Sequence, residues 1–379
     1  MPAGWGETGV RDDYRYVIEL FRANGEAVGQ VALTPDWEPA VECARLAGLR
    51  SFGVWAVDSG AEHSVEPLWH TELGEPYVAR FRVHLKAGGD REWFEDFPAL
   101  RYFADAAREA AARLIESGAL AKGDTVRYRP AAFRRPVNSA AASLSFDAAE
   151  APTPLALRST VLAGFLESSV VCGTVNPQDF EVLVPRWAVD EAAALTRAAG
   201  ARETGGVLIG HLHQDPITRE IFAEVTAQIP ARHTQGDSVK LTFTSDTWTD
   251  VRSAIALRHR EEMMLGWWHS HPAIEWCKNC PPERQRVCQL AKGFVSADDR
   301  ALHRAILPRA FGVALVMTNA LTGVTATLFG WRSGLLEPRG FRLLGDHLAA
   351  LEETASQYGA GSAQDAERAE PVNADVVLP

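Results

Sequence analysis

In the first third of the chain, apolar residues recur with two periodicities, one of two residues, as in a strand, and one of about 3.6 residues, as in a helix. These periodicities predict a hairpin at residues 14–33, further strand at residues 65–85 and a last strand at residues 125–128. They also predict a helix at residues 36–49 and an amphipathic helix at residues 94–117. This mixture predicts a smaller amino-terminal α+β domain over residues 1–130.

A second set of elements follows, in which short apolar runs alternate with helical patterns. The predicted strands lie at residues 180–184, 206–210, 221–229, 263–268, 311–318 and 323–331. The predicted helices lie at residues 189–199, 247–262 and 300–307. This order fits an α/β domain over residues 161–350.

Two segments of the 379-residue chain lack such patterns. Residues 131–160 are rich in Ala, Ser, Pro and Arg, which is typical of a linker. Residues 351–379 are rich in Ala, Glu, Gly and Gln and are predicted to form a disordered tail. The chain is too long for one ordinary domain and suits two, each large enough for its own core.

The apolar run at residues 263–268 leads directly into His269-Ser-His271-Pro272. In a buried strand, residues two apart share a face, so both imidazoles point the same way and can bind one metal ion. A lone His-x-His is more often a chance surface pair, so the prediction depends on what lies around it.

A carboxylate and a base are available on either side of this strand. Asp299 follows Ser296 at the start of the helix predicted at residues 300–307, and the first turn would aim it back at the histidines. Glu203 stands just before the glycine-marked strand at residues 206–210. Taken singly, Ser-x-x-Asp is an ordinary capping box and Glu203 a solvated acid. Together with two His they are the parts of a catalytic zinc hydrolase.

The order of these residues resembles the JAMM motif of the JAB/MPN metalloproteases, which is a Glu on an early strand, then His-x-His-Pro, then Ser-x-x-Asp. The five matching residues are Glu203, His269, His271, Ser296 and Asp299. The resemblance covers residues 180–331, less than half of the chain. It implies a mixed sheet flanked by helices and a deubiquitinase-like isopeptidase of the prokaryotic type.

The expected mechanism assigns one role to each of these residues. His269, His271 and Asp299 would hold one catalytic Zn²⁺, which lowers the pKa of a bound water towards ~7. Glu203 would take the proton of that water and return it to the leaving amine. Ser296 would donate a hydrogen bond to the oxyanion.

The resemblance also implies the partner. The substrate would be the extended carboxyl-terminal tail of a ubiquitin-like protein, and residues 237–243 are a candidate edge strand for it, or else a plain structural strand. The fusion to an unrecognised amino-terminal domain resembles prokaryotic members that act with activating and conjugating enzymes in defence against phage. We expect that domain to recognise the partner and to perform no chemistry.

One segment departs from the family pattern. Residues 273–295 separate the second His from the Ser by far more than is usual, and contain Cys277, Cys280 and Cys288 in a C-x2-C-x7-C pattern. Three clustered thiols indicate a second, structural zinc, a disulfide or reduced thiols. The local pattern lacks a fourth ligand, for which the candidates are His303, Glu275, Glu283 or a residue of the other domain.

Composition and motif spacing bear on the partner, the location and the class of enzyme. The net charge of −11 argues against a nucleic-acid partner, and no apolar run reaches the ~20 residues that span a bilayer. No basic and apolar leader opens the chain, so a cytoplasmic protein is expected. A zinc deaminase would need His-x-Glu, but His271 stands two after His269. The main alternative is a catalytically inactive or autoinhibited JAB/MPN scaffold subunit.

Overall fold

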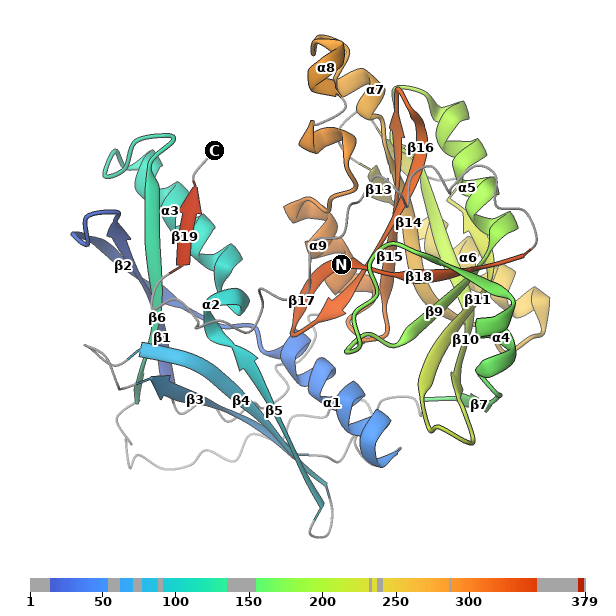
Figure 1. Cartoon of the computed structure of the whole chain (residues 1–379), viewed down its shortest axis with the longest axis horizontal. Coiled ribbons are helices and arrows are strands. Elements are labelled where there is room, and N and C mark those ends of the chain that lie inside the picture. Colours follow the sequence, from blue (N-terminus) through green and yellow to red (C-terminus); the bar gives the residue numbers. More distant parts are fainter. Residues whose placement is uncertain are drawn as a thin grey trace. The chain divides into compact units, whose positions relative to one another are not determined.

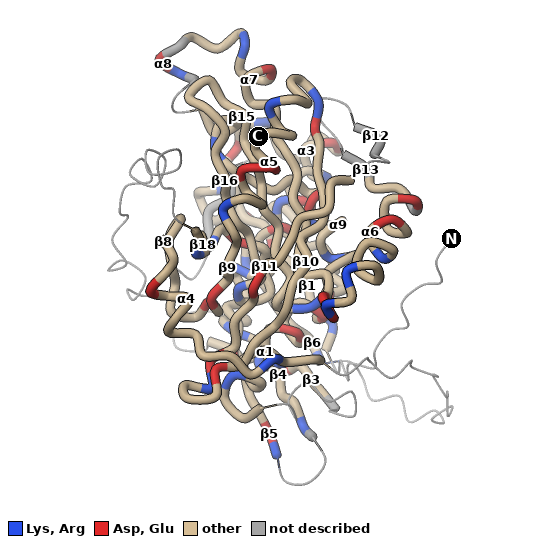
Figure 2. The backbone as a smooth tube through the Cα atoms, turned by 90° about the vertical axis from the view of Figure 1, so that its right-hand side faces the viewer, with Lys and Arg blue, Asp and Glu red and all other residues tan. Residues whose placement is uncertain are grey.

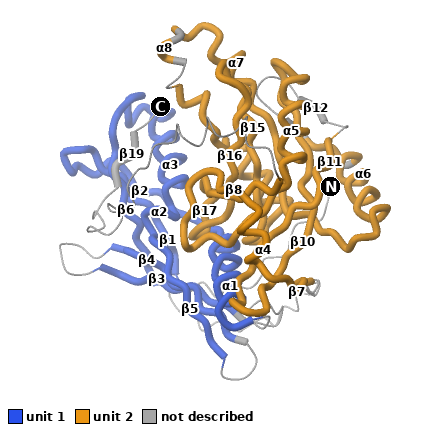
Figure 3. Tube along the Cα trace, turned by 45° about the vertical axis from the view of Figure 1, so that its right-hand side comes forward, with its two compact units in different colours: residues 1–154, 362–379 blue, residues 155–361 orange. Residues whose placement is uncertain are grey.

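The computed structural model describes residues 14–53, 62–70, 77–87, 91–134, 155–231, 234–236, 241–285, 288–345 and 374–377. The chain divides into two compact units (Figures 1 and 3). Unit 1 comprises Met1–Pro154 and Ser362–Pro379, and unit 2 comprises Leu155–Gly361. Among the described residues, no helix has the length and apolar character that crossing a membrane requires.

Unit 1 has the predicted α+β character. Its four-stranded antiparallel sheet has the order β19 (Ala374–Val377), β6 (Thr125–Arg134), β1 (Tyr14–Arg22) and β2 (Ala27–Leu33). Its three-stranded sheet consists of β3 (Glu62–His70), β4 (Tyr77–Ala87) and β5 (Arg91–Pro98). The helices are α1 (Glu38–Phe52), α2 (Ala99–Tyr102) and α3 (Ala104–Glu116). Large side chains such as Ile18, Leu20 and Phe81 form one buried core between these elements.

Two of the sequence predictions for unit 1 differ from the structure as follows. The helix predicted at residues 94–117 begins later, because its first residues belong to β5, where Phe97 pairs with Phe81 of β4 and is buried. Pro98 then ends the strand, and the helices follow. Residues 374–377, predicted to lie in a disordered tail, form β19 and pair with β6.

Unit 2 is built on a ten-stranded mixed sheet of order β17-β16-β15-β14-β10-β11-β9-β18-β8, with β7 paired to one end of β10. In chain order its strands are β7 (Leu157–Ser159), β8 (Ser169–Cys172), β9 (Glu181–Pro185), β10 (Gly205–Gln214), β11 (Ile221–Pro230), β14 (Met263–His271), β15 (Val313–Ala320), β16 (Gly323–Arg332), β17 (Leu335–Arg339) and β18 (Phe341–Leu344). The pairs of β14 with β15 and of β9 with β11 and β18 are parallel. The predicted mixed α/β fold is confirmed.

Helices and a separate hairpin complete unit 2. The helices are α4 (Ala163–Glu167), α5 (Arg186–Ala199), α6 (Ser245–Arg258), α7 (Ala273–Trp276), α8 (Pro282–Gln285) and α9 (Ala297–Ile306), with a short 3₁₀ helix at Gln289–Ala291. The hairpin pairs β12 (Thr234–Gly236) with β13 (Leu241–Phe243). The predicted edge strand at residues 237–243 therefore falls partly on β13, and residues 237–240 lie outside the described part of the chain.

The predicted linker and tail fall largely outside the described residues. The domain limits predicted at residues 130 and 160 fall within β6 and just beyond β7. Residues 135–154 of the predicted linker lie outside the described part of the chain, as do residues 351–373 of the predicted tail. Both predictions stay as they were made for these residues.

Two glycines allow β10 to lie close to its neighbours. A Cβ added at Gly210 would lie 1.9 Å from the carbonyl oxygen of Glu224 on β11. A Cβ added at Gly206 would lie 2.5 Å from both the carbonyl oxygen of Ile229 and Nε1 of Trp268. Backbone atoms of a central sheet cannot move aside cheaply, so larger residues are excluded here.

We therefore expect Gly210→Ala to lower the free energy of unfolding by about 1–3 kcal/mol, measured by chemical denaturation. Gly164→Ala in α4 is the matched control, since a Cβ there meets no atom within 4 Å. An equal effect of the two substitutions would contradict the close packing of β10 against β11.

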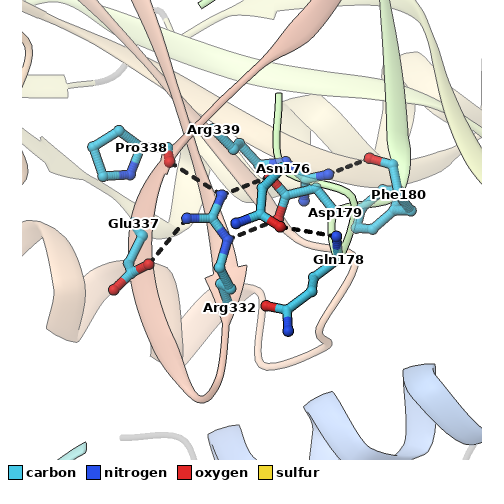
Figure 4. Close-up of polar contacts among 8 residues, drawn as sticks. All are labelled: Asn176, Gln178, Asp179, Phe180, Arg332, Glu337, Pro338 and Arg339. Atoms are coloured by element: carbon cyan, nitrogen blue, oxygen red, sulfur yellow. Dashed lines mark hydrogen bonds and ion pairs between the residues drawn. The ribbon is translucent and has the colours of Figure 1, made fainter. Parts of the chain in front are cut away.

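Two arginines, Arg339, which is buried, and Arg332, which is partly buried, link β17 and β16 to the segment before β9 (Figure 4). Arg332 binds both carboxylate oxygens of Asp179, at 3.0 and 2.6 Å, and Glu337 at 3.1 Å. The Arg339 guanidinium lies 4.2 Å from the centre of the Phe180 ring and donates to the Phe180 carbonyl. These contacts fix the strands at one end of the sheet by charge-assisted bonds.

Charged residues of both signs are interspersed along the described trace (Figure 2). The chain as a whole carries a formal net charge of −11.

Candidate metal centre

Strand β14 lies between β10 and β15 in the sheet (Figure 1), and His269 and His271 are among its last residues. The two side chains are almost completely buried, with 0% and 2% of their surface exposed. Their Nε2 atoms are 2.9 Å apart. The chance surface pair is thereby excluded, because both rings leave the same face of an internal strand and converge.

Aromatic rings hold both imidazoles in place. Trp267 stacks on His269, with 4.6 Å between the ring centres, and its Nε1 donates to Nδ1 of His303 over 2.9 Å. His271 lies 4.4 Å from the ring of Phe294 and 5.0 Å from that of Trp276. Phe294 and Trp276 both belong to the long segment of residues 273–295, which therefore lines the site directly.

Asp299 reaches the histidines from the first turn of α9. The Ser296 hydroxyl accepts from the backbone N–H of Asp299 over 3.1 Å, and Oδ2 of Asp299 accepts from the N–H of Ser296 over 2.8 Å. This capping box fixes where the helix begins and so aims the carboxylate. Oδ2 of Asp299 lies 3.5 Å from Nε2 of His269.

The three side chains suit a divalent metal ion. Each offers one ligand atom, and these atoms lie within 4.8 Å of one another. Burial, followed by the neighbouring His269, lowers the pKa of His271 to about 3, so its imidazole is neutral, as a ligand must be. Burial opposes the charge of Asp299, but the hydrogen bonds from His269 and Ser296 outweigh it and hold the pKa of that carboxyl well below its usual range. Two imidazoles and one carboxylate form a donor set that fits Zn²⁺.

Glu203 lies in the loop that leads into β10, and its side chain is buried. Thr204 donates its N–H to Oγ of Ser270 over 2.9 Å, and Ser270 donates its N–H to the carbonyl of Thr204 over 2.8 Å. Ser270 stands between the two histidines, so this pair of hydrogen bonds holds the Glu203 segment beside them. The roles of Glu203 as base and of Ser296 as oxyanion donor stay predictions.

A family comparison adds to this geometry. Residues 185–275 match the model of prokaryotic homologs of the JAB domain. The chain contains a JAB domain. The match spans Glu203, His269 and His271 and ends before Ser296 and Asp299, which the fold brings to the same place. No curated protein matches the chain.

Among solved structures, the chain is similar to the solution structure of protein DSY2949 from Desulfitobacterium hafniense. The two share 19% sequence identity, and the alignment covers 45% of this chain and 96% of that protein, with a TM-score of 0.30.

The three cysteines of residues 273–295 converge in the segment that follows the candidate metal centre. The Cys277 and Cys288 sulfurs lie 3.5 Å apart, and all three sulfurs lie within 4.8 Å of one another with no disulfide between them. Burial and the neighbouring thiols raise the pKa of Cys277 to about 11, while the backbone N–H of Leu290 and the Cys277 thiol lower the pKa of Cys288. The arrangement keeps the structural zinc a testable prediction.

Two of the candidates for a fourth ligand have other partners. His303 accepts its hydrogen bond from Trp267 and is fully buried. Glu275 forms an ion pair with Lys278. Within the described part of the chain, the group contains only the three sulfurs and no fourth ligand-type side chain, so water would complete a tetrahedral site.

We expect the cobalt-substituted protein to show a sulfur-to-cobalt charge-transfer absorption that disappears in the variant with Cys277, Cys280 and Cys288 replaced by Ser. Metal content should fall by one ion per chain, because three thiolates bind a soft divalent metal tightly. Replacing Cys43 and Cys172 by Ser is the control, since these thiols lie outside the group. An unchanged spectrum in the triple variant would leave reduced thiols as the explanation.

A third group of ligand-type side chains was not predicted from the sequence. It consists of His211 and His213 on β10 and Glu224 on β11. The signal was present, because His211-Leu-His213 is a second His-x-His at the end of an apolar strand.

Proposed function

We propose that this chain is a zinc-dependent peptidase or isopeptidase that cleaves behind the carboxyl-terminal tail of a ubiquitin-like protein. The observation that carries the proposal is the meeting of His269, His271 and Asp299 at the end of β14, with Glu203 held beside them. The JAB domain supports the same reaction class.

Each residue of the site has its own role in the proposed reaction. Zinc bound by the three ligands would supply a Lewis acid and a water of lowered pKa. The Glu203 carboxylate accepts a proton during attack on the amide and returns it to the leaving amine. The Ser296 oxygen accepts a bond as the helix cap, which leaves its O–H proton able to donate to the developing oxyanion. Phe294 and Trp276 shield the His271 side of the site from water.

We assign recognition of the ubiquitin-like tail to the edge of a β-sheet. In β-augmentation an extended peptide adds beside a strand through backbone bonds that do not depend on sequence. The hairpin of β12 and β13 is the proposed place, since it is a short sheet of its own. Partners in this scheme include the enzymes that activate and conjugate the ubiquitin-like protein, and defence against phage is the setting that the resemblance suggests.

The amino-terminal unit is proposed to capture the same partner. It exposes Trp69 and Phe94, with 41% and 47% of their surfaces accessible, and aromatic side chains are enriched at protein interfaces. Replacing Trp69 by Ala should then raise KM and leave kcat unchanged. A change in kcat alone would remove this assignment.

The test uses the zinc-loaded full chain and a ubiquitin-like protein extended beyond its Gly-rich carboxyl terminus, with the products identified by mass spectrometry. We expect a single cut at the end of the tail, and none after treatment with a chelator. Binding of the fusion without cleavage, at any zinc concentration, would instead identify an inactive scaffold.

A further inference from the structure

The group of His211, His213 and Glu224 lies far from the centre at His269. Gly205, at the start of β10, pairs with His269, whereas His213 is eight residues further along the same strand. At ~3.3 Å per residue this is roughly 26 Å of strand. The two His-x-His pairs of the domain therefore serve separate sites.

The strand register places the three side chains on one face. His211 and His213 are two residues apart on β10, and Glu224 of β11 is the register partner of His211. One ligand atom from each lies within 4.8 Å of the other two. Both histidines are buried, with 6% and 4% of their surfaces exposed, and Phe222 stacks on the His213 ring at 4.8 Å. The rings are therefore already fixed before any ligand binds.

His211 is set in the tautomer that a metal ligand needs. Its Nε2 lies 2.8 Å from the carbonyl oxygen of Arg260, which can only accept, so Nε2 carries the hydrogen. In the neutral ring Nδ1 then holds a lone pair, and this atom is buried without a hydrogen-bond partner. Metal-bound histidines commonly donate their second N–H to a backbone carbonyl in this way.

His213 has the matching arrangement. Its Nδ1 lies 2.9 Å from Oγ1 of Thr160 and its Nε2 lies 3.0 Å from Oε2 of Glu224. Without a metal, Nε2–H donates to the carboxylate. When a cation binds, the neutral ring exchanges its Nε2 proton for one at Nδ1 through solvent. Nδ1–H then donates to the threonine hydroxyl, and Nε2 and Oε2 become neighbouring ligands.

The distance between Nε2 of His213 and Oε2 of Glu224 is close to the distance between two ligand atoms of one zinc ion. Ligand distances of ~2.0–2.2 Å require about 3.3 Å between neighbouring ligand atoms of a tetrahedral site. The 3.0 Å between Nε2 of His213 and Oε2 of Glu224 therefore needs to open only slightly.

A hydrogen-bonded network alone accounts for His213, Glu224 and Thr160. It does not account for Nδ1 of His211, since a buried acceptor without a partner has lost its hydrogen bonds to water and gained none in return. We infer that His211, His213 and Glu224 form a further binding site, separate from the His269 centre and from the three cysteines, for a divalent transition metal such as Zn²⁺, with a water as the fourth ligand. The Glu224 side chain remains 25% exposed, which gives the ion and its water access from one side.

The role of this site is structural. Thr160 follows β7, and Arg260 lies between α6 and β14, so the two groups that orient the ligands come from segments on both sides of β10 in sequence. A bound ion would tie these segments to β10 and β11. No step of the proposed peptidase reaction passes through the site.

The test counts zinc ions by native mass spectrometry of the chelator-treated full chain after titration with Zn²⁺. We expect one ion fewer per chain in both His211→Gln and Glu224→Gln than in the wild type. Glu224→Gln retains the size of the side chain and an amide able to contact His213, so the protein keeps its fold while losing the charged ligand. His84→Gln, which changes a histidine of the other unit, is the matched control and should bind as many ions as the wild type.

Thermal unfolding at each point of the same zinc titration tests whether the bound ion stabilises the folded protein. Zinc should raise Tm less in the two variants than in the wild type, because a ligand that binds only the folded state stabilises it. Equal zinc counts in the wild type and both variants would overturn the site and leave an ordinary hydrogen-bonded network. This outcome is independent of the proposed cleavage reaction, which is read from products and from the His269 centre.

Discussion

Glu203→Gln should lower kcat by roughly 10³-fold while the zinc content of the protein stays the same. The amide keeps the volume of the side chain but cannot accept the proton that the reaction releases. Glu203 is buried in a loop that hydrogen bonds to Ser270 hold in place through Thr204, and these bonds do not involve the altered group. The expected result is therefore a loss of chemistry without a loss of structure.

Cleavage of the extended ubiquitin-like fusion and elemental analysis on the same sample measure both halves of this prediction. Glu191→Gln on α5 is the matched control, because that glutamate is exposed and should affect neither quantity. If Glu203→Gln instead released zinc, Glu203 would be a ligand. If cleavage continued at the wild-type rate, another group would have to act as the base.

The sequence predicts that His269, His271 and Asp299 lie together because each part of this arrangement depends on local rules. Period two in a buried strand places His269 and His271 on one face, and a capping box determines where α9 begins and so where Asp299 points. The structure brings these three together as expected. Glycine before an apolar strand likewise indicated β10, whose close packing against β11 and β14 needs Gly206 and Gly210.

What the sequence could not predict depends on register between strands that are distant in the chain. Whether His211 faces Glu224 depends on how β10 pairs with β11, and a shift of one residue would turn every side chain to the other face. The short strands β17 and β18 were missed because four or five residues carry too little periodicity. The contact of Phe294 with His271 arises from the path of a segment without regular patterning.

Asp299→Asn should abolish cleavage by removing the catalytic metal, while the metal-free protein keeps almost its full stability. The two functions of this residue can be separated because they use different properties of the side chain. As part of the cap it needs an oxygen that accepts from the N–H of Ser296, and asparagine supplies one. As a ligand it needs a negative charge, and asparagine lacks it.

Ser296→Ala should show the opposite pattern. It removes the hydroxyl that accepts from the N–H of Asp299, which destabilises the helix start by about 1 kcal/mol. The carboxylate remains but is less well aimed, so zinc affinity should fall by roughly 10–100-fold instead of being lost. Zinc titration by calorimetry and chemical denaturation of the metal-free proteins compare the two variants directly. Retained zinc in Asp299→Asn would mean that Asp299 serves only as a helix cap, and the third ligand of the centre would have to come from another side chain.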